Sequence, residues 1–214
     1  MQTRHYNSFD RLIINLDQAV RTLAGKPLVT GRDNPANTQE DTELTDTERT
    51  ESARLMRINH AGEVAAQALY QGQALTARLE KTRSSMEQAV REENDHLDWC
   101  EQRVKELDSH TSLLNPLWYL GSFGIGAAAG AIGDKWSLGF IAETERQVVD
   151  HLEDHLTRLP ENDKKSRAIV EQMKQDEALH GANAKASGGI ELPQPVKKLM
   201  QLASNIMTET AYRV

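Results

Sequence analysis

One pattern restricts the fold of this chain more than any other: a glutamate followed about 30 residues later by Glu-x-x-His, and it occurs twice. The interval between the two glutamates is 30 residues in the first copy and 32 in the second. Residues three apart on a helix lie on the same face, so each Glu-x-x-His pair can bind one ion. The residues are Glu63, Glu93 and His96 in the first copy, and Glu145, Glu177 and His180 in the second.

These glutamates interrupt or adjoin hydrophobic stripes with the spacing of a helix. Glu93 fills the position between Val90 and Leu97, and Glu177 follows Met173 on the same face. A carboxylate on a core-facing position costs free energy unless a partner neutralises it. The stripes therefore predict four helices, each with one inward carboxylate that requires such a partner.

The lengths and connections of the helical patterns predict an all-α fold. Strand signals are absent, and two short connections and one long crossover between long helices are typical of a four-helix bundle. We divide the chain into an N-terminal helix with a polar linker, 1–45, and a bundle domain, 46–214. A capping box of Thr45 and Glu48 begins the bundle. We expect the bundle helices over 47–81, 84–109, 136–159 and 161–186, with terminal helices over 6–24 and 195–211.

The partner of the four glutamates is expected to be metal. Two divalent ions bring four positive charges against four carboxylates, and without them such burial is untenable. Oxygen and imidazole ligands suit iron or manganese, and the arrangement is that of the di-iron and di-manganese carboxylate proteins. Cys100 is the only cysteine, so a cysteine-based site is excluded.

Some individual assignments have competitors close by. Glu143 competes with Glu145, and Glu92 competes with Glu93, although in each pair only the second residue shares the hydrophobic stripe. His60 precedes Glu63 by three residues and imitates the Glu-x-x-His spacing. We interpret His60 as a residue that supports the ligands or the fold.

The crossover between the second and third bundle helices is apolar and contains no charged residue from 111 to 133. A single membrane span would place the two halves of the bundle on opposite sides, so we exclude it. The favoured hypothesis is that 113–133 associates with a membrane surface or forms a hydrophobic substrate channel, with Trp118, Tyr119 and Trp136 near the interface. The alternative is a buried loop or helix that packs through Gly126 and Gly130.

Four segments give the chain a family resemblance: "MRINHAGEVAAQALYQGQ" (56–73), "EENDHL" (92–97), "ETERQVVDHLEDHL" (143–156) and "DEALHGANA" (176–184). Together with the crossover they resemble the demethoxyubiquinone hydroxylases of ubiquinone biosynthesis over about 48–214. The resemblance implies a ferritin-like fold and a membrane-associated di-iron monooxygenase. It also implies that the six repeat residues are the iron ligands, and that His151 corresponds to a family histidine near the site. A hydrogen-bonded core histidine is the alternative for His151.

The resemblance implies that the enzyme uses O₂ to hydroxylate the ring of a polyprenylated 6-methoxy-3-methyl-1,4-benzoquinol. Two iron ions would carry this chemistry, with electrons from an external reductant. Trp118, Tyr119 and Phe123 are candidates for lining the substrate route, or for anchoring the protein at the membrane. We expect peripheral attachment to the cytoplasmic face of a bacterial cell membrane, with a homo-oligomer or a biosynthetic complex as further options.

Other function classes remain alternatives or are excluded. A net charge of −7 gives no basic surface for nucleic acid. A ferritin-like iron store or a manganese catalase would use the same ligands, but neither needs so apolar a crossover. A rubrerythrin-like peroxidase is excluded by the single cysteine. A non-catalytic membrane-bound scaffold is disfavoured because all four helices keep their candidate ligands. The sequence assigns no role to residues 1–45.

Overall fold

The computed structural model describes residues 8–214, except for the side chains of Ser8, Phe9, Arg11, Leu12, Lys81 and Ser85. The described residues form helices and no strand, which confirms the all-α prediction. The predicted first helix began at residue 6, so its first two residues lie outside the described part. The elements are α1 (Ser8–Ala24), the 3₁₀-helix η1 (Pro35–Thr38), α2 (Asp46–Thr76), α3 (Glu80–Glu106), α4 (Asn115–Ile132), α5 (Asp134–Arg158), α6 (Lys164–Ala186) and α7 (Gln194–Ala211).

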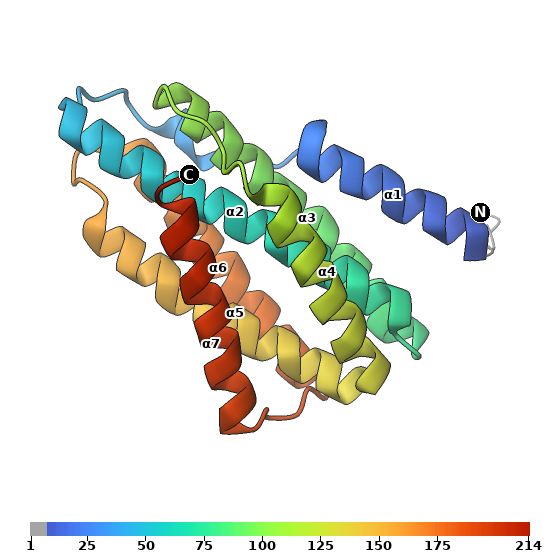
Figure 1. The fold of residues 1–214 in the computed structure, drawn as a ribbon. Coiled ribbons are helices and arrows are strands. Elements are labelled where there is room, and N and C mark those ends of the chain that lie inside the picture. Colours follow the sequence, from blue (N-terminus) through green and yellow to red (C-terminus); the bar gives the residue numbers. More distant parts are fainter. Residues whose placement is uncertain (1–7) are drawn as a thin grey trace.

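Four long helices form the predicted bundle. Helix α2 packs against α3, α5 packs against α6, and contacts between α3 and α6 join the two pairs (Figure 1). The connections within each pair are short, whereas the connection from α3 to α5 is long and contains α4. This is the ferritin-like arrangement, with one long crossover between two helical hairpins.

The first bundle helix begins at the predicted capping box. The Thr45 hydroxyl accepts a hydrogen bond from the Glu48 backbone N–H at 3.3 Å, and the Glu48 carboxylate accepts one from the Thr45 N–H at 2.8 Å. Two backbone donors at the helix start are thereby satisfied. The capping-box prediction is confirmed.

Helix α2 ends at Thr76, five residues before the predicted end at 81. The backbone is extended at the two ends of the short connection, and the Asp134 carboxylate accepts hydrogen bonds from the N–H groups of Arg78 at 3.0 Å and Leu79 at 2.9 Å. Helix α3 then begins at Glu80, four residues before the predicted start. A side chain from a distant helix therefore fixes a break that the local sequence does not mark.

The predicted starts of the last two bundle helices also move. Helix α5 begins at Asp134, two residues before the predicted start. Gly133 alone joins α4 to α5, and its φ is 146°. Helix α6 begins at Lys164, three residues late, because the Asp163 side chain caps it by accepting from the Ser166 N–H at 3.0 Å.

The apolar crossover contains a helix, α4, that packs closely along α2. A Cβ atom on Gly126 would lie 2.1 Å from the Leu69 carbonyl oxygen, and one on Gly130 would lie 2.1 Å from the Thr76 hydroxyl. Only glycine permits this approach of the two helices. The packing alternative thus describes the inner face of α4, while the membrane hypothesis concerns its outer face.

The outer face of α4 leaves large apolar side chains in solvent. Leu117 and Leu120 are exposed on α4, as are Leu199, Leu202 and Ile206 on α7. Both helices lie in front of the bundle core in Figure 1. Among the described residues, no helix combines the length and apolarity needed to cross a membrane.

Candidate metal centre

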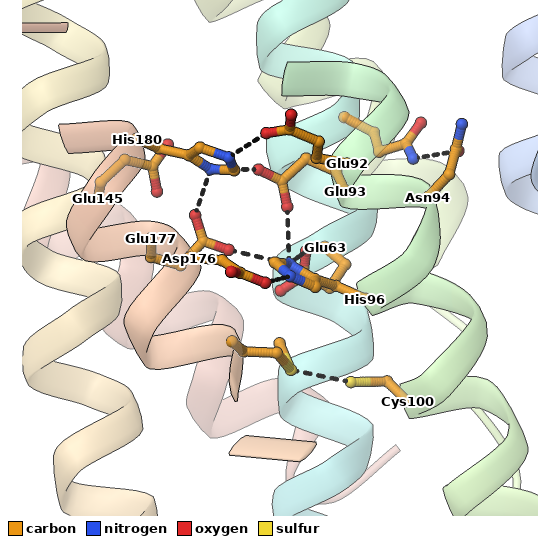
Figure 2. A network of polar contacts seen from close by, with 12 residues as sticks. Glu63, Glu92, Glu93, Asn94, His96, Cys100, Glu145, Asp176, Glu177 and His180 are labelled. Carbon is orange, nitrogen blue, oxygen red and sulfur yellow. Dashed lines mark hydrogen bonds and ion pairs between the residues drawn. The ribbon is translucent and has the colours of Figure 1, made fainter. Parts of the chain in front are cut away.

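The four bundle helices place their predicted glutamates in the interior. All four side chains are almost inaccessible to solvent, and they come from different helices: Glu63 from α2, Glu93 from α3, Glu145 from α5 and Glu177 from α6. The two histidines of the repeat, on α3 and α6, point toward the same region (Figure 2). The structure therefore brings together all six residues that the repeat singled out.

The centre of the cluster has the dimensions of a metal site. Glu63, Glu93, His96 and Glu177 each offer one ligand atom, and these atoms all lie within 4.8 Å of one another. The His96 Nδ1 atom lies 3.0 Å from Glu177, 3.2 Å from Glu93 and 3.7 Å from Glu63. One small ion between these groups would be reached by ligands from three helices.

Glu93 and Glu177 lie between the two imidazoles. Each carboxylate directs one oxygen toward His96 Nδ1 and the other toward His180 Nδ1, at distances of 3.0–3.2 Å (Figure 2). A carboxylate with an imidazole on each oxygen is placed to bridge two ions. The geometry thus suits a pair of metals, one beside each histidine.

Glu145 completes the second half of the cluster. The Tyr70 hydroxyl, buried on α2, donates a short hydrogen bond to Glu145 Oε1. The competing residue, Glu143, faces another direction and is paired with Arg146 and Lys197. Of the two candidates on α5, the structure therefore places Glu145 in the cluster, as the hydrophobic stripe predicted.

Burial and mutual repulsion change the proton affinity of these groups. Burial, reinforced by Glu93, raises the pKa of Glu63, and burial reinforced by Glu177 raises that of Glu145. Burial alone would lower the pKa of His180, but its hydrogen bonds to Glu177 and Glu93 raise it to about 12. The cluster therefore retains protons that neutralise its carboxylates, and a metal ion would take their place.

Three carboxylate oxygens of the cluster support the replacement of protons by a metal ion. Oε2 of Glu63, Oε1 of Glu93 and Oε1 of Glu177 are buried and lack a well-oriented hydrogen-bond donor. The last two lie 3.2 Å and 3.0 Å from an imidazole Nδ1, which is close to them but is not aligned for a hydrogen bond. Carboxylate oxygens and imidazole nitrogens suit iron or manganese, so the residues present fit a di-metal centre.

Each histidine is held from behind by an acid on the opposite helix. His96 Nε2 lies 2.9 Å from Asp176, and His180 Nε2 lies 2.7 Å from Glu92 (Figure 2). These contacts direct Nδ1 of both rings toward the cluster, as acids behind metal-bound histidines commonly do. From the sequence we rejected Glu92 as a ligand and interpreted it as an outward-facing charge or one that supports the ligands, whereas Asp176 was missed. The signal was present, because an acid directly precedes each Glu-x-x-His.

Two other histidines make contacts outside the cluster. His151 contacts the buried His155, with ring centroids 3.8 Å apart, and burial lowers the pKa of His151 to about 4. Among the described residues, no hydrogen bond or ion pair joins His151 to the six, so its place near the metals stays a prediction. His60 lies 3.4 Å from the Asn115 amide of α4, which fits a role in the fold.

The three aromatic residues proposed for a substrate route lie on the inner side of α4. Tyr119 is buried, donates a short hydrogen bond to Gln71 and stacks on Phe123, with centroids 6.5 Å apart. Trp118 is half-buried and packs against the main hydrophobic core. None of the three lines the 980 Å³ cavity between α1, α2 and α3, so their role on a route stays a prediction.

Comparison with known proteins places this geometry in a family context. The model of the family described as "Ubiquinone biosynthesis protein COQ7" matches residues 50–211. A protein of Nitrosococcus oceani is 59% identical over 212 residues, which cover 99% of both chains. Proteins of Stutzerimonas stutzeri and Acinetobacter baylyi are each 56% identical, over 99% of this chain and 98% and 100% of theirs. All three bear the name 3-demethoxyubiquinol 3-hydroxylase.

Proposed function

The chain belongs to the family of the ubiquinone biosynthesis protein COQ7, and from this membership we propose that it is a 3-demethoxyubiquinol 3-hydroxylase. The observation that carries the proposal is the 59% identity over almost the whole length of a relative with that name. The buried Glu/His cluster supplies the site that an oxidative hydroxylation needs. The activity is that of a monooxygenase in ubiquinone biosynthesis.

The cofactor we propose is a pair of iron ions. Glu63, Glu93 and His96 would hold one ion and Glu145, Glu177 and His180 the other, with Glu93 and Glu177 reaching both. When bound, the irons supply the redox chemistry that activates O₂ for insertion of an oxygen atom into the ring. The electrons come from an external reductant.

The residues of this chain prepare the site for that chemistry. Asp176 and Glu92 fix the orientation of the two imidazoles, and Tyr70 holds one oxygen of Glu145. On the side toward Cys100, the Cys100 thiol lies 3.6 Å from the Met173 sulfur within the main hydrophobic core, so this wall of the site is apolar. An apolar wall limits the access of water to a reactive centre.

We propose that the enzyme meets its substrate at a membrane surface. A quinol with a polyprenyl tail resides in the bilayer, and the exposed leucines of α4 and α7 offer a surface that can contact lipid. We propose that the protein attaches peripherally to the cytoplasmic face of a bacterial cell membrane. An iron store, a manganese catalase or a scaffold is the alternative, and the names of the relatives favour the hydroxylase over all three.

A genetic experiment tests the activity. We expect a strain that lacks this protein to accumulate demethoxyubiquinone, measured by chromatography and mass spectrometry of lipid extracts. The wild-type gene should restore ubiquinone, whereas a Glu177→Ala variant should not. If the deletion strain accumulates no demethoxyubiquinone, the hydroxylase proposal is wrong.

A further inference from the structure

The segment between α1 and α2 lies against the metal centre. We call residues 26–41 the N-terminal strap. Its Thr30 donates to the Asp95 carboxylate through the backbone N–H at 2.7 Å and through the hydroxyl at 2.5 Å, and its Leu28 carbonyl accepts from the Asn94 amide at 3.0 Å. Asp95 is fully buried beneath these contacts. The strap is thus attached to the two residues that lie between the candidate ligands Glu93 and His96.

Further along, the strap reaches the other Glu-x-x-His helix. A guanidinium nitrogen of Arg32 lies 2.6 Å from Oδ2 of Asp176 on α6. The same Asp176 oxygen lies 2.9 Å from His96 Nε2. A continuous polar chain therefore runs from the strap through Asp176 to a metal-facing imidazole.

Arg32 contacts a second group that packs on the same imidazole. Its guanidinium carbon lies 5.1 Å from the centroid of the Trp99 ring, and the Trp99 ring lies 5.5 Å from that of His96. Trp99 is almost completely buried. One arginine thus touches both Asp176, which binds His96 through Nε2, and Trp99, which packs beside its ring.

The other half of the cluster has a different arrangement. Glu92, behind His180, accepts from the neutral Gln88 amide at 3.0 Å and has no arginine partner among the described residues. The strap therefore introduces an asymmetry into a site that the sequence repeat makes nearly symmetric. A substitution of Arg32 should therefore weaken binding of the metal at His96 more than binding of the metal at His180.

We propose that Arg32 is a positioning residue for the metal centre, acting through Asp176 and Trp99 to fix His96 with Nδ1 toward the carboxylates. The inference rests on the proposed metal function of the cluster. The planar guanidinium can pair with a carboxylate and lie over an indole at the same time, which a lysine cannot reproduce in full. It gives the strap, for which the sequence indicated no role, a part in the site.

The alternative is an ordinary surface ion pair, which contributes little to stability and leaves the metals unaffected. The chain contains a matched control for that case. Arg158 lies 2.8 Å from Glu51 and 5.5 Å from the ring centroid of Tyr212, and its side chain is 39% exposed against 36% for Arg32. Arg158 therefore makes the same kinds of contact away from the Glu/His cluster.

The test titrates Co²⁺ alone into the metal-free full-length protein against a competing chelator, and follows the visible absorption of the bound ions. Wild type should bind about two ions per chain. Removing an outer partner of a metal ligand typically costs about 10–100-fold in affinity. We therefore expect Arg32→Met to weaken one of the two ions about 10-fold and to change its spectrum. Arg32→Lys should recover most of the affinity, and Arg158→Met should bind Co²⁺ like wild type.

The outcomes separate this inference from the proposed metal function. Circular dichroism first establishes that each variant is folded. Unchanged binding of both ions by Arg32→Met, or an equal loss in Arg158→Met, would overturn the positioning role while leaving the metal centre in place. Failure of wild type to bind Co²⁺ would overturn the metal centre itself, and the inference with it. In a double-mutant cycle, Arg32→Met should add little to Asp176→Asn, because the two residues act in one chain.

Discussion

At the scale of single residues, the short segment from Glu92 to His96 contacts three different parts of the molecule. Glu93 and His96 face the Glu/His cluster, while Glu92 supports His180 on the opposite helix. Asn94 and Asp95 bind the N-terminal strap. Because successive residues turn around the helix axis, five adjacent side chains reach three different structures. A substitution anywhere in this segment should therefore disturb the metal centre directly or through one intermediate group.

Glu177 should be indispensable for both metals. It lies between the two imidazoles, with one oxygen toward each, so Glu177→Ala removes a ligand from each half of the cluster. We expect the variant to lose most of the iron of the wild-type protein, measured as bound iron per chain after gel filtration. Glu171→Ala, on the same helix but paired with Lys174, should retain it. Retention of both irons by Glu177→Ala would contradict the ligand assignment.

His60 should make stability depend on pH. Burial lowers its pKa from 6.5 to about 4, so the unfolded chain takes up a proton on this ring at a higher pH than the folded chain. The contribution of the neutral His60 ring to the free energy of unfolding is therefore complete above pH 6.5 and is lost as the pH falls toward 4. Between pH 7 and pH 5 the loss is about 2 kcal/mol.

The measurement compares wild type with His60→Gln, which cannot take up this proton. Denaturant unfolding of both proteins in the presence of a chelator excludes any contribution from metal release. Groups other than His60 titrate in both proteins, so the difference between the two pH profiles reports this residue. If the free energies of unfolding of the two proteins fall in parallel from pH 7 to pH 5, protonation of His60 does not contribute to the loss of stability.

At the scale of elements, the packing of α4 on α2 depends on glycine. Gly126→Ala would place its Cβ 2.1 Å from the Leu69 carbonyl oxygen, so the helices must move apart. We expect the free energy of unfolding to fall by about 1–3 kcal/mol, as for other overpacked interfaces. Gly124→Ala, on the same helix with nothing within 4 Å, should instead stabilise by about 0.5–1 kcal/mol. Equal effects of the two substitutions in chemical denaturation would show that the close approach is unimportant.

Elements with local signals could be predicted, and those set by distant contacts could not. The capping box at Thr45 and the carboxylates in the hydrophobic stripes lie within a few residues of what they determine. The end of α2 depends instead on Asp134, more than 50 residues away, and the strap depends on Arg32 reaching Asp176. Both contacts involve a carboxylate that belongs to no periodic pattern in the sequence. Helix propensity and hydrophobic periodicity therefore predict neither the end of α2 nor the position of the strap, because tertiary contacts override local preference.

At the scale of the molecule, a charged cluster is buried in the interior while one face exposes apolar side chains. The charged groups of the cluster are buried among four helices, whereas apolar side chains of α4 and α7 are exposed. The ribbons of both helices lie in front of the bundle in Figure 1. Removing 113–133 would not test that face alone, because it would also remove the helix that packs along α2. Charges introduced at exposed positions change the surface while leaving this packing in place.

Leu120→Glu combined with Leu202→Glu should release the protein from lipid vesicles. Both leucines are more than half exposed, at 70% and 55%, so the change should not disturb the core. Burying one leucine contributes about 1.5–3 kcal/mol, and losing two such contributions predicts at least a 10-fold weaker partition into vesicles, measured by flotation. Leu28→Glu, in the strap beside α3 and 61% exposed, is the control and should bind vesicles like wild type. Unchanged flotation of the double variant, with its helical content and metal binding intact, would exclude this face as the membrane surface.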